Sequence, residues 1–493
     1  MGGPYVGIGA ADPGGPAFHQ KQTEGDDHLK PKRHNDLGND PLGTLLLRLA
    51  VPAITAQLVN ALYNIVDRMY IGHIAGVGDL ALTGLGVAFP VIMFISALSA
   101  LAGMGGGSKA AIRMGAGDEE GANAILGNCT ALLFIISIVV TIFFQAFKDP
   151  LLMLFGASEN TIGYAADYLG IYLWGTIAVQ MSLGLNNFIT TQGFSTTSMM
   201  TVIIGAVCNI VLDPIFIFGL DMGVKGAALA TIIAQAVSAV WVLKFLTGKK
   251  SKLKIQRRHL RVDPKVILPV MAIGVSPFIM QSTESLVNIA LNSSLKHYGG
   301  DVYVGAMTIA SSIMQVLVMP FQGLSQGAQP IIGFNYGAGK LDRVRKTFKL
   351  MFIAGVSLSV AGFLLVQLFP QMFIAIFNDK PELVQVTEWA MHIYFGGMFA
   401  LGVQFSCQQT FVALGQAKVS LFLALLRKIV LLIPLVLLLP HVLPYLLPAG
   451  MANREVFSVY VAEPIADILA GTTTGLVFLW KFPKILKARE EQN

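Results

Sequence analysis

The sequence predicts an all-α protein that crosses a membrane many times. Of its 493 residues, 54% are hydrophobic and only 13% are charged, whereas a soluble domain carries roughly 25% charged residues. The apolar residues are gathered in long runs of about 20 residues or more, which is the length a helix needs to cross a bilayer. An outer-membrane barrel would need short alternating strands, and these runs are too long and too continuously apolar for that.

The first segment, residues 1–43, is rich in Gly, Pro, His and charged residues and shows no apolar periodicity. It lacks the apolar core of a signal peptide, and its composition is typical of a disordered segment. We therefore expect a disordered cytoplasmic tail before the first span, which begins at Thr44.

Twelve predicted spans follow, in two sets of six. The division falls at KKSKLKIQRRHLRVDPK, residues 249–265, a strongly basic stretch that we interpret as a cytoplasmic linker. The predicted domains are a first lobe at 44–248, that linker, a second lobe at 266–482 and a cytoplasmic tail at 483–493. The predicted spans are 44–72, 80–104, 123–147, 164–190, 198–219, 225–246, 266–292, 302–324, 345–370, 388–412, 418–440 and 455–480.

The distribution of Lys and Arg predicts the orientation of these spans. Most basic residues fall in segments and helix ends that lie on one side, and we count Arg427 and Lys428 with them. The segments on the other side carry isolated residues such as Lys148 and Lys296, and Arg68 is left within a span. Because Lys and Arg are retained on the cytoplasmic side, the sequence predicts a multi-pass protein of the cell membrane with both termini in the cytoplasm.

The two sets of spans resemble each other. A shift of 222 residues places Gly115-Ala116-Gly117 on Gly337-Ala338-Gly339, and it also places Gly193 on Gly415. Because six spans return the chain to the side on which it started, the two halves must share one orientation. The sequence therefore predicts two pseudo-symmetric six-helix lobes related by an axis along the membrane normal.

Two acidic residues lie inside predicted spans of the first half, Asp67 and Asp213. An ionised carboxylate in hydrocarbon costs several kcal/mol, so such residues are normally kept for a function and face a protein interior or a watery cavity. Pro214 follows Asp213 and frees the carbonyl of Ile210 by removing a helix donor. Carboxylates and freed carbonyls are ligands that a small hard cation prefers. The alternatives are that Asp67 pairs with Arg68 and that Asp213 only accepts hydrogen bonds at a kink.

Neutral polar residues accompany these acids. Asn209 precedes Asp213 by one helical turn, and Thr231 lies at a similar depth, although Thr in a membrane helix often bonds its own backbone. We predict a cation-coupling group that would bind Na⁺ directly if the ion is sodium, and it consists of Asp67, Asn209, Asp213 and Thr231.

A second set of polar residues predicts a substrate cavity, with hydrogen bonds between helices as the alternative. In the second half the central candidate is Glu284, the most deeply placed acid there, while Glu463 and Asp467 of the last span are expected to face an aqueous vestibule. The predicted cavity residues are Asn60, Tyr63, Asn64, Gln281, Glu284, Asn288, Gln404 and Gln408.

Other chemistries find no support in the sequence. The glycine cluster GMGGGSKAAIRMGAG lacks the Gly-Lys-Ser/Thr order of a phosphate-binding loop, so close helix contact and a tight turn explain it better. The three cysteines have no metal-binding spacing, and the net charge of +6 follows from membrane topology. We therefore expect no enzyme and no cofactor beyond Na⁺ or H⁺ as coupling ion. The expected partners are the lipid bilayer and small organic cationic or amphipathic substrates, with no nucleic acid, and the protein is expected to be a monomer.

The segments VPAITAQLVNALYNIVDRMYIGHIAG, NIVLDPIFIFG and GVKGAALAT, with the paired GAGD and GAGK turns, resemble the multidrug and toxic compound extrusion (MATE) family, in particular its DinF-like and MepA-like prokaryotic branch. The resemblance covers about residues 44–480. It implies a V-shaped bundle of two lobes and antiport of organic cations against Na⁺ or H⁺ by alternating access.

The resemblance also implies roles for particular residues. Asp67 matches the family's acid in the first helix, and Asn209, Asp213 and Thr231 match its N-lobe cation site. Pro52 matches the proline at which the first helix bends, and Pro214 is expected to bend the fifth span. Glu284 resembles an acid that some relatives carry in the seventh helix.

Two other functions stay open at this point. The first is a lipid-linked oligosaccharide flippase of the same superfamily, which would need several Arg or Lys residues in the cavity for pyrophosphate. Only Arg68 is left within a predicted span. The second is a polytopic membrane protein that does not transport, such as a receptor or an enzyme.

Overall fold

The computed structural model describes residues 35–376, 381–448 and 451–491. Within these ranges the chain forms helices, turns and loops and no strand. Ten of the described helices are long and apolar enough to cross a bilayer. A further pair, α4 and α5, is bent by 60° and together forms an eleventh such element. Long apolar runs thus produce the predicted helical membrane fold, because only a helix satisfies every backbone hydrogen bond inside its own segment.

The first half of the chain supplies six of the predicted spans. The span predicted at 164–190 is broken at Gly175, where a Cβ atom would lie only 2.2 Å from Cγ2 of Ile232. The span predicted at 198–219 changes from α to π geometry after Pro214. The elements are α1 (Leu42–Gly72), α2 (Gly78–Gly115), α3 (Glu119–Leu154), α4 (Ile162–Trp174), α5 (Thr176–Thr191), α6 (Ser195–Pro214), the π turn η1 (Ile215–Gly219) and α7 (Gly223–Thr247).

The second half follows the same plan with more interruptions. The span predicted at 388–412 consists of two α-helices joined by a 3₁₀ turn, and the span at 418–440 contains a π-helical turn. The elements are η2 (Arg257–His259), α8 (Pro264–Gly299), α9 (Asp301–Gly337), α10 (Leu341–Leu368), α11 (Pro370–Ile374), α12 (Pro381–Tyr394), η3 (Phe395–Ala400), α13 (Leu401–Ala413), α14 (Ala417–Leu425), η4 (Leu426–Leu432), α15 (Ile433–Val442), η5 (Leu443–Tyr445) and α16 (Arg454–Glu490).

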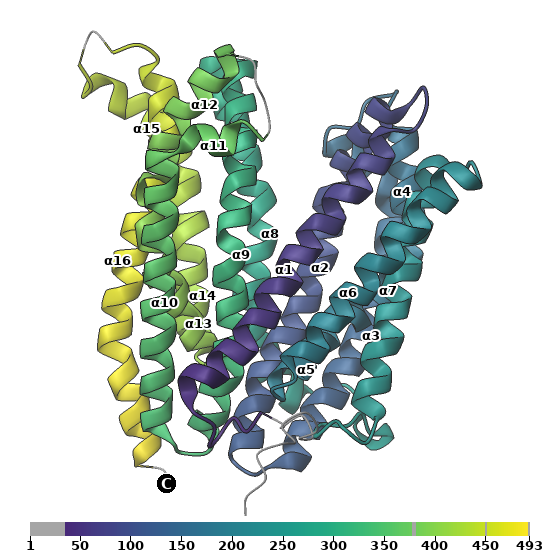
Figure 1. Ribbon diagram of the computed structural model, residues 1–493, viewed down its shortest axis with the longest axis vertical. Coiled ribbons are helices and arrows are strands. Elements are labelled where there is room, and N and C mark those ends of the chain that lie inside the picture. The colour runs from purple at the N-terminus through teal and green to yellow at the C-terminus, as the bar shows by residue number, and fades with distance from the viewer. Residues whose placement is uncertain (1–34, 377–380, 449–450, 492–493) are drawn as a thin grey trace, which may run out of the picture. The chain divides into compact units, whose positions relative to one another are not determined.

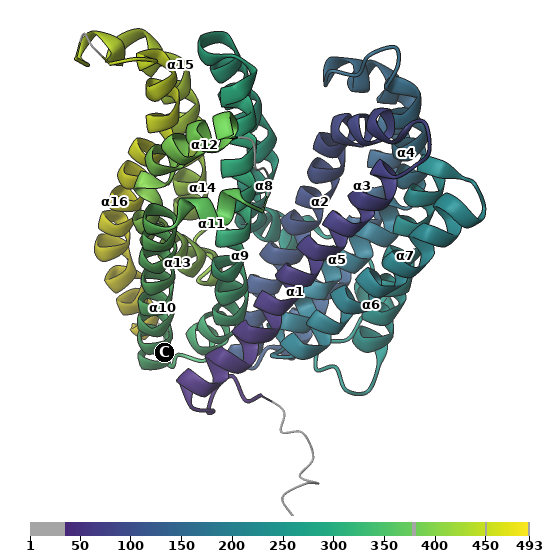
Figure 2. The same ribbon diagram turned by 45° about the horizontal axis from the view of Figure 1, so that its top comes forward.

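The start of α1 and the end of α16 lie at the same end of the helices (Figure 1), and a second view agrees (Figure 2). The linker between α7 and α8 lies at this end too. We call this end the linker face and the opposite end the far face. An even number of crossings accounts for both described chain ends lying on one face.

Reciprocal contacts between α2 and α9 follow the predicted repeat. A Cβ atom on Gly115 would lie 1.8 Å from the carbonyl oxygen of Phe334, and one on Gly337 would lie 1.9 Å from that of Ile112. Both pairs obey the same 222-residue shift. Two helices that cross through equivalent residues are what a twofold relation between the halves demands.

The glycine-rich segment at the end of α2 stays helical up to Gly115, eleven residues beyond the predicted end of this span at residue 104. Its small residues let α2 approach α8, since a Cβ on Gly105 would lie 2.3 Å from the Val270 carbonyl oxygen. Gly327 of α9 approaches Ala50 of α1 in the same way. Such small-residue contacts bring membrane helices together closely, and here they join the two halves near the linker face.

Residues 35–40 touch both halves of the protein. In the first half, Asn35 Nδ2 donates to the Gly193 carbonyl at 2.9 Å. In the second half, Asn335 Nδ2 donates to the Leu37 carbonyl at 2.8 Å, and Arg343 donates to the carbonyls of Leu37 and Asp40. The ordered chain therefore begins before the predicted first span. Residues 1–34 of the expected tail lie outside the described residues.

The conformation of this segment is held by Asp36. Its carboxylate accepts hydrogen bonds from the Asn39 side chain at 2.8 Å and from the Gly38 amide at 2.9 Å. The Asn39 hydrogen bond is the main cause that holds the pKa of Asp36 below its ordinary value. The ionised form is thus the one that fits this turn.

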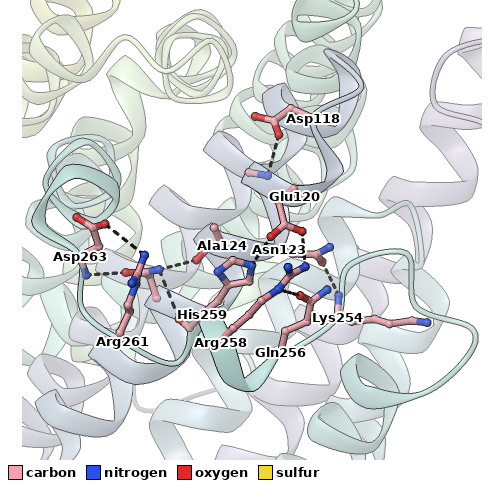
Figure 3. A network of polar contacts seen from close by, with 12 residues as sticks. Asp118, Glu120, Asn123, Ala124, Lys254, Gln256, Arg258, His259, Arg261 and Asp263 are labelled. Carbon is pink, nitrogen blue, oxygen red and sulfur yellow. Dashed lines mark hydrogen bonds and ion pairs between the residues drawn. The ribbon is translucent and has the colours of Figure 1, made fainter.

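The linker is docked on α3 by side chains that cap its backbone, as Figure 3 shows. The buried Asn123 and Asn128 accept linker backbone N–H groups at 2.8 and 2.7 Å. Glu120 pairs with Arg258 and His259 at 2.7 and 2.8 Å. These contacts attach the linker to the first half.

Gln192 provides a further anchor, which gives a testable prediction. Its buried Oε1 accepts hydrogen bonds from the amides of Lys252 and Leu253 at 2.7 and 2.9 Å and from the Ser251 hydroxyl at 3.0 Å. Gln192→Ala should destabilise the protein by about 2 kcal/mol or more, because buried donors lose their acceptor. The measurement is the midpoint of heat denaturation in detergent. Gln256→Ala, which removes an exposed linker contact, should barely move the midpoint, and equal effects would contradict the anchoring role.

Candidate functional site

Asp67 of α1 and Asp213 of α6 come together inside the first half. Asp67 is 7% exposed and Asp213 is fully buried. The two carboxyl groups lie within hydrogen-bonding reach of each other. Two ionised carboxylates in contact repel strongly in a low-dielectric interior, so such a pair takes up a proton or another cation between them.

The other two residues of the predicted cation group join this pair. Asn209 Nδ2 donates to Asp213 Oδ1 at 3.2 Å and lies 3.4 Å from the Thr231 hydroxyl. Three buried oxygens of the group have no partner in the structure, namely Asp67 Oδ1, Asn209 Oδ1 and Asp213 Oδ2. Buried polar atoms are normally satisfied, so this set of oxygens fits a proton or a small cation.

Tyrosine side chains on α4 complete the site, and sequence reasoning missed them. Tyr168 lies close to Asp67 and hydrogen-bonds the Thr231 side chain. Its ring stacks on that of Tyr172, with centroids 6.2 Å apart. Tyr63 of α1 lies close to both acids. The signal in the sequence was Tyr at every fourth position of the fourth span, which places these rings on one helix face.

The alternative that Asp67 pairs with Arg68 finds no support in the geometry. Asp67 is turned toward Asp213, whereas the Arg68 guanidinium lies over the ring of Phe89, 4.9 Å from its centroid. Adjacent residues on a helix point about 100° apart, which explains the divergence.

A polar cavity adjoins the acid pair. It encloses about 440 Å³, part of it open to solvent, and the predicted Asn60 and Tyr63 line it. Asn64 does not line it, since its side chain donates to the Asn60 carbonyl of its own helix at 2.7 Å. The lining residues are Asn60, Tyr63, Ser182, Leu183, Asn186, Thr201, Val202, Gly205, Ala206, Asn209, Thr231, Ala234, Gln235 and Ser238.

The two prolines predicted to bend helices differ in their surroundings. At Pro214 the α geometry ends and the π turn η1 begins, because proline offers no amide to the preceding turn. Pro52 lies inside α1, which continues unbroken from Leu42 to Gly72.

In the second half the structure separates the residues predicted for a substrate cavity. Gln281, Glu284 and Asn288 lie on an exposed side of α8. Gln404 and Gln408 of α13 are buried, and Gln408 Nε2 lies 3.5 Å from the Ser276 hydroxyl. These five residues therefore do not share one surface.

Two basic residues that we assigned to the cytoplasmic side lie inside a span, so that assignment was wrong. Arg427 and Lys428 are part of the π-helical turn η4. Arg427 donates to Glu463 at 3.0 Å and to Asp467 at 2.7 Å. Both acids are buried, so the expectation that they face an aqueous vestibule was also wrong. The signal was the adjacent Arg-Lys within the apolar run LRKIVLLIP, about ten residues past the start of the span.

Comparison with known proteins gives a family and several relatives. The MatE family model matches residues 52–215 and 277–438, one stretch in each half. The multidrug export protein MepA of Staphylococcus haemolyticus is 22% identical over 425 residues, which cover 86% of this chain and 91% of that protein. MepA of Staphylococcus saprophyticus is 24% identical, over 78% of this chain and 84% of that protein.

Solved structures share the fold. The MATE multidrug transporter DinF-BH, solved with a drug-like ligand bound, is 37% identical, with a TM-score of 0.82 over 93% of this chain and 99% of that chain. An outward-facing MATE family transporter of the MOP superfamily has a TM-score of 0.83 at 23% identity, over 91% of this chain and 97% of that chain. The predicted fold class is therefore confirmed.

Proposed function

Because the chain belongs to the MATE family of membrane transporters, we propose that it exports organic cations and drugs in exchange for protons bound at Asp67 and Asp213. The observation that carries this proposal is the contact between these two buried carboxyl groups. Its support from relatives is that the MepA proteins are multidrug exporters and that DinF-BH holds a drug-like ligand in its solved structure.

The direction of transport follows from orientation. The linker face carries the basic linker, and basic segments stay in the cytoplasm. In this assignment both described chain ends are cytoplasmic. The glycine contacts between α1 and α9 and between α2 and α8 close the cytoplasmic side. The halves at 44–248 and 266–482 then act as two lobes that rock about these contacts between outward-facing and inward-facing states.

Proton binding is the simplest occupancy of the acid pair. A proton held between two carboxyl groups removes their repulsion and satisfies an unpartnered oxygen. From the outside, the pair takes up a proton when the lobes are open there, and it releases the proton when they open to the cytoplasm. Asn209 and Thr231 position Asp213 through the hydrogen-bond chain described above.

The test is transport of ethidium by proteoliposomes in which pH and sodium gradients are imposed separately. We expect a pH gradient to drive ethidium movement and an equal sodium gradient to leave it at the level of protein-free vesicles. Transport driven by sodium alone would replace the proton with Na⁺ at the same residues. Transport that is equally fast without either gradient would contradict antiport.

The flippase alternative loses support from the charges inside the spans. Pyrophosphate would need basic side chains without acidic partners. In the described residues, Arg427 and Lys428 are each paired with carboxylates, and Arg68 lies over Phe89.

A further inference from the structure

Lys428 lies between the interior of the second half and one of its surfaces. Its side chain is only 9% exposed, while that of its partner Glu284 is 62% exposed. The Lys428 ammonium donates to the Met280 carbonyl at 2.9 Å and pairs with the Glu284 carboxylate. A backbone carbonyl and a carboxylate of α8 thus hold an ammonium ion at the protein surface.

The surface around Glu284 is polar and lies beside the first half. Gln281, Glu284 and Asn288 are spaced three and four residues apart, which places them on one side of α8. Phe278, one turn nearer the linker face than Gln281, contacts Phe94 of α2 with ring centroids 5.8 Å apart. The polar side of α8 therefore continues from the point where the two halves meet.

Behind Lys428 lies a second place for its ammonium. Arg427 is shared by Glu463 and Asp467, so this buried group has two carboxylates and one guanidinium. One oxygen of each carboxylate, Glu463 Oε2 and Asp467 Oδ2, has no hydrogen-bond partner. Lys428 is close enough to interact electrostatically with both acids.

We infer that Lys428 is a displaceable counter-ion that selects cationic substrates. An organic cation with an ammonium-like group takes the place of Lys428 on Glu284 and the Met280 carbonyl. The Lys428 ammonium then moves to the free oxygens of Glu463 and Asp467. This inference rests on the proposed function and names the substrate class and the binding site on α8.

The exchange keeps every charge paired. Before it, Lys428 neutralises Glu284, and after it, the substrate does so while Lys428 neutralises the buried acid pair. A charge left unpaired in a membrane interior is costly, so a neutral compound cannot release Lys428. Lysine suits this role because its ammonium is a compact charge on a flexible stem.

The first test is a cryo-EM structure of the full-length Glu284→Gln variant. We expect Lys428 Nζ within hydrogen-bonding distance of Glu463 or Asp467, because the outer carboxylate charge is gone. Glu284→Asp, which keeps that charge, should leave Lys428 on α8. A Lys428 that stays on the Met280 carbonyl in the Gln variant would overturn the inference.

The second test is a fluorescence titration of ethidium against purified protein. Lys428→Met keeps the stem and removes the competing ammonium, so binding should tighten about fivefold or more. The gain should vanish in the double variant with Glu284→Gln. Lys418→Met, at an exposed position of α14, is the matched control and should bind as the unaltered protein does.

The two proposals fail in different ways. Unchanged ethidium affinity in Lys428→Met, with pH-driven transport intact in the unaltered protein, contradicts only the counter-ion role. Absence of pH-driven transport in the unaltered protein contradicts the proposed function. In that case the position of Lys428 in the Glu284→Gln structure still decides the exchange.

Discussion

Replacing Asp67 with Asn should reduce pH-driven ethidium transport to the level of protein-free vesicles while the protein stays folded. Asn has nearly the same shape and can still hydrogen-bond Asp213, but it cannot take up or release a proton. Removing one of two carboxyl groups in contact also removes their repulsion, so stability should be kept or should rise. The measurements are ethidium flux in proteoliposomes and the midpoint of heat denaturation.

The matched control is Asp79→Asn. Asp79 is an exposed acid in the first turn of α2, so its neutralisation should leave the flux unchanged. If Asp67→Asn transported ethidium under a pH gradient as fast as the control, the proton would have to bind elsewhere and the proposed mechanism would be wrong.

Replacing Gly115 with Ala should disturb the contact that closes the linker face. The added Cβ would lie 1.8 Å from the Phe334 carbonyl oxygen, a backbone atom that cannot yield without moving α9. Forced overpacking of this kind costs about 1–3 kcal/mol. We expect heat denaturation at a lower temperature and a transport rate lower by about tenfold, since that energy falls on one of the two transport states.

Two comparisons make this prediction sharp. Gly337→Ala should have a similar effect, because Gly337 meets the Ile112 carbonyl in the reciprocal position. Gly86→Ala, in the same helix α2, should be neutral or stabilising, because a Cβ there meets nothing within 4 Å and Ala favours helix. Equal behaviour of Gly115→Ala and Gly86→Ala would show that the crossing of α2 and α9 does not limit transport.

Patterns of apolar length and intramembrane charge predicted much of this architecture. The spans were predictable because a bilayer requires long apolar helices. The grouping of Asp67, Asn209, Asp213 and Thr231 was predictable because buried acids are costly and attract polar partners. The repeat was visible at glycines such as Gly115 and Gly337, where two backbones cross too closely for a side chain.

What could not be predicted depends on helix rotation and on local geometry. Gln404 and Gln408 looked similar to Glu284 in one dimension, but the 3₁₀ turn before α13 contributes to a rotation that places them in the interior. The π turn η4 has an irregular period, so Arg427 and Lys428 could not be assigned to a face. Counting them as loop residues treated charge as a sign of solvent, which fails where a charge has a buried partner.

The short peptide ahead of α1 has a practical consequence for where the protein can be shortened. A cut placed just before Leu42 would spare every hydrophobic helix, and a hydropathy plot would judge it harmless. It would nevertheless remove Asn35 and Leu37, through which Gly193 in one half and Asn335 in the other are bridged by a single strip of backbone. The limit of what can be trimmed therefore lies near Asn35, ahead of the first apolar helix.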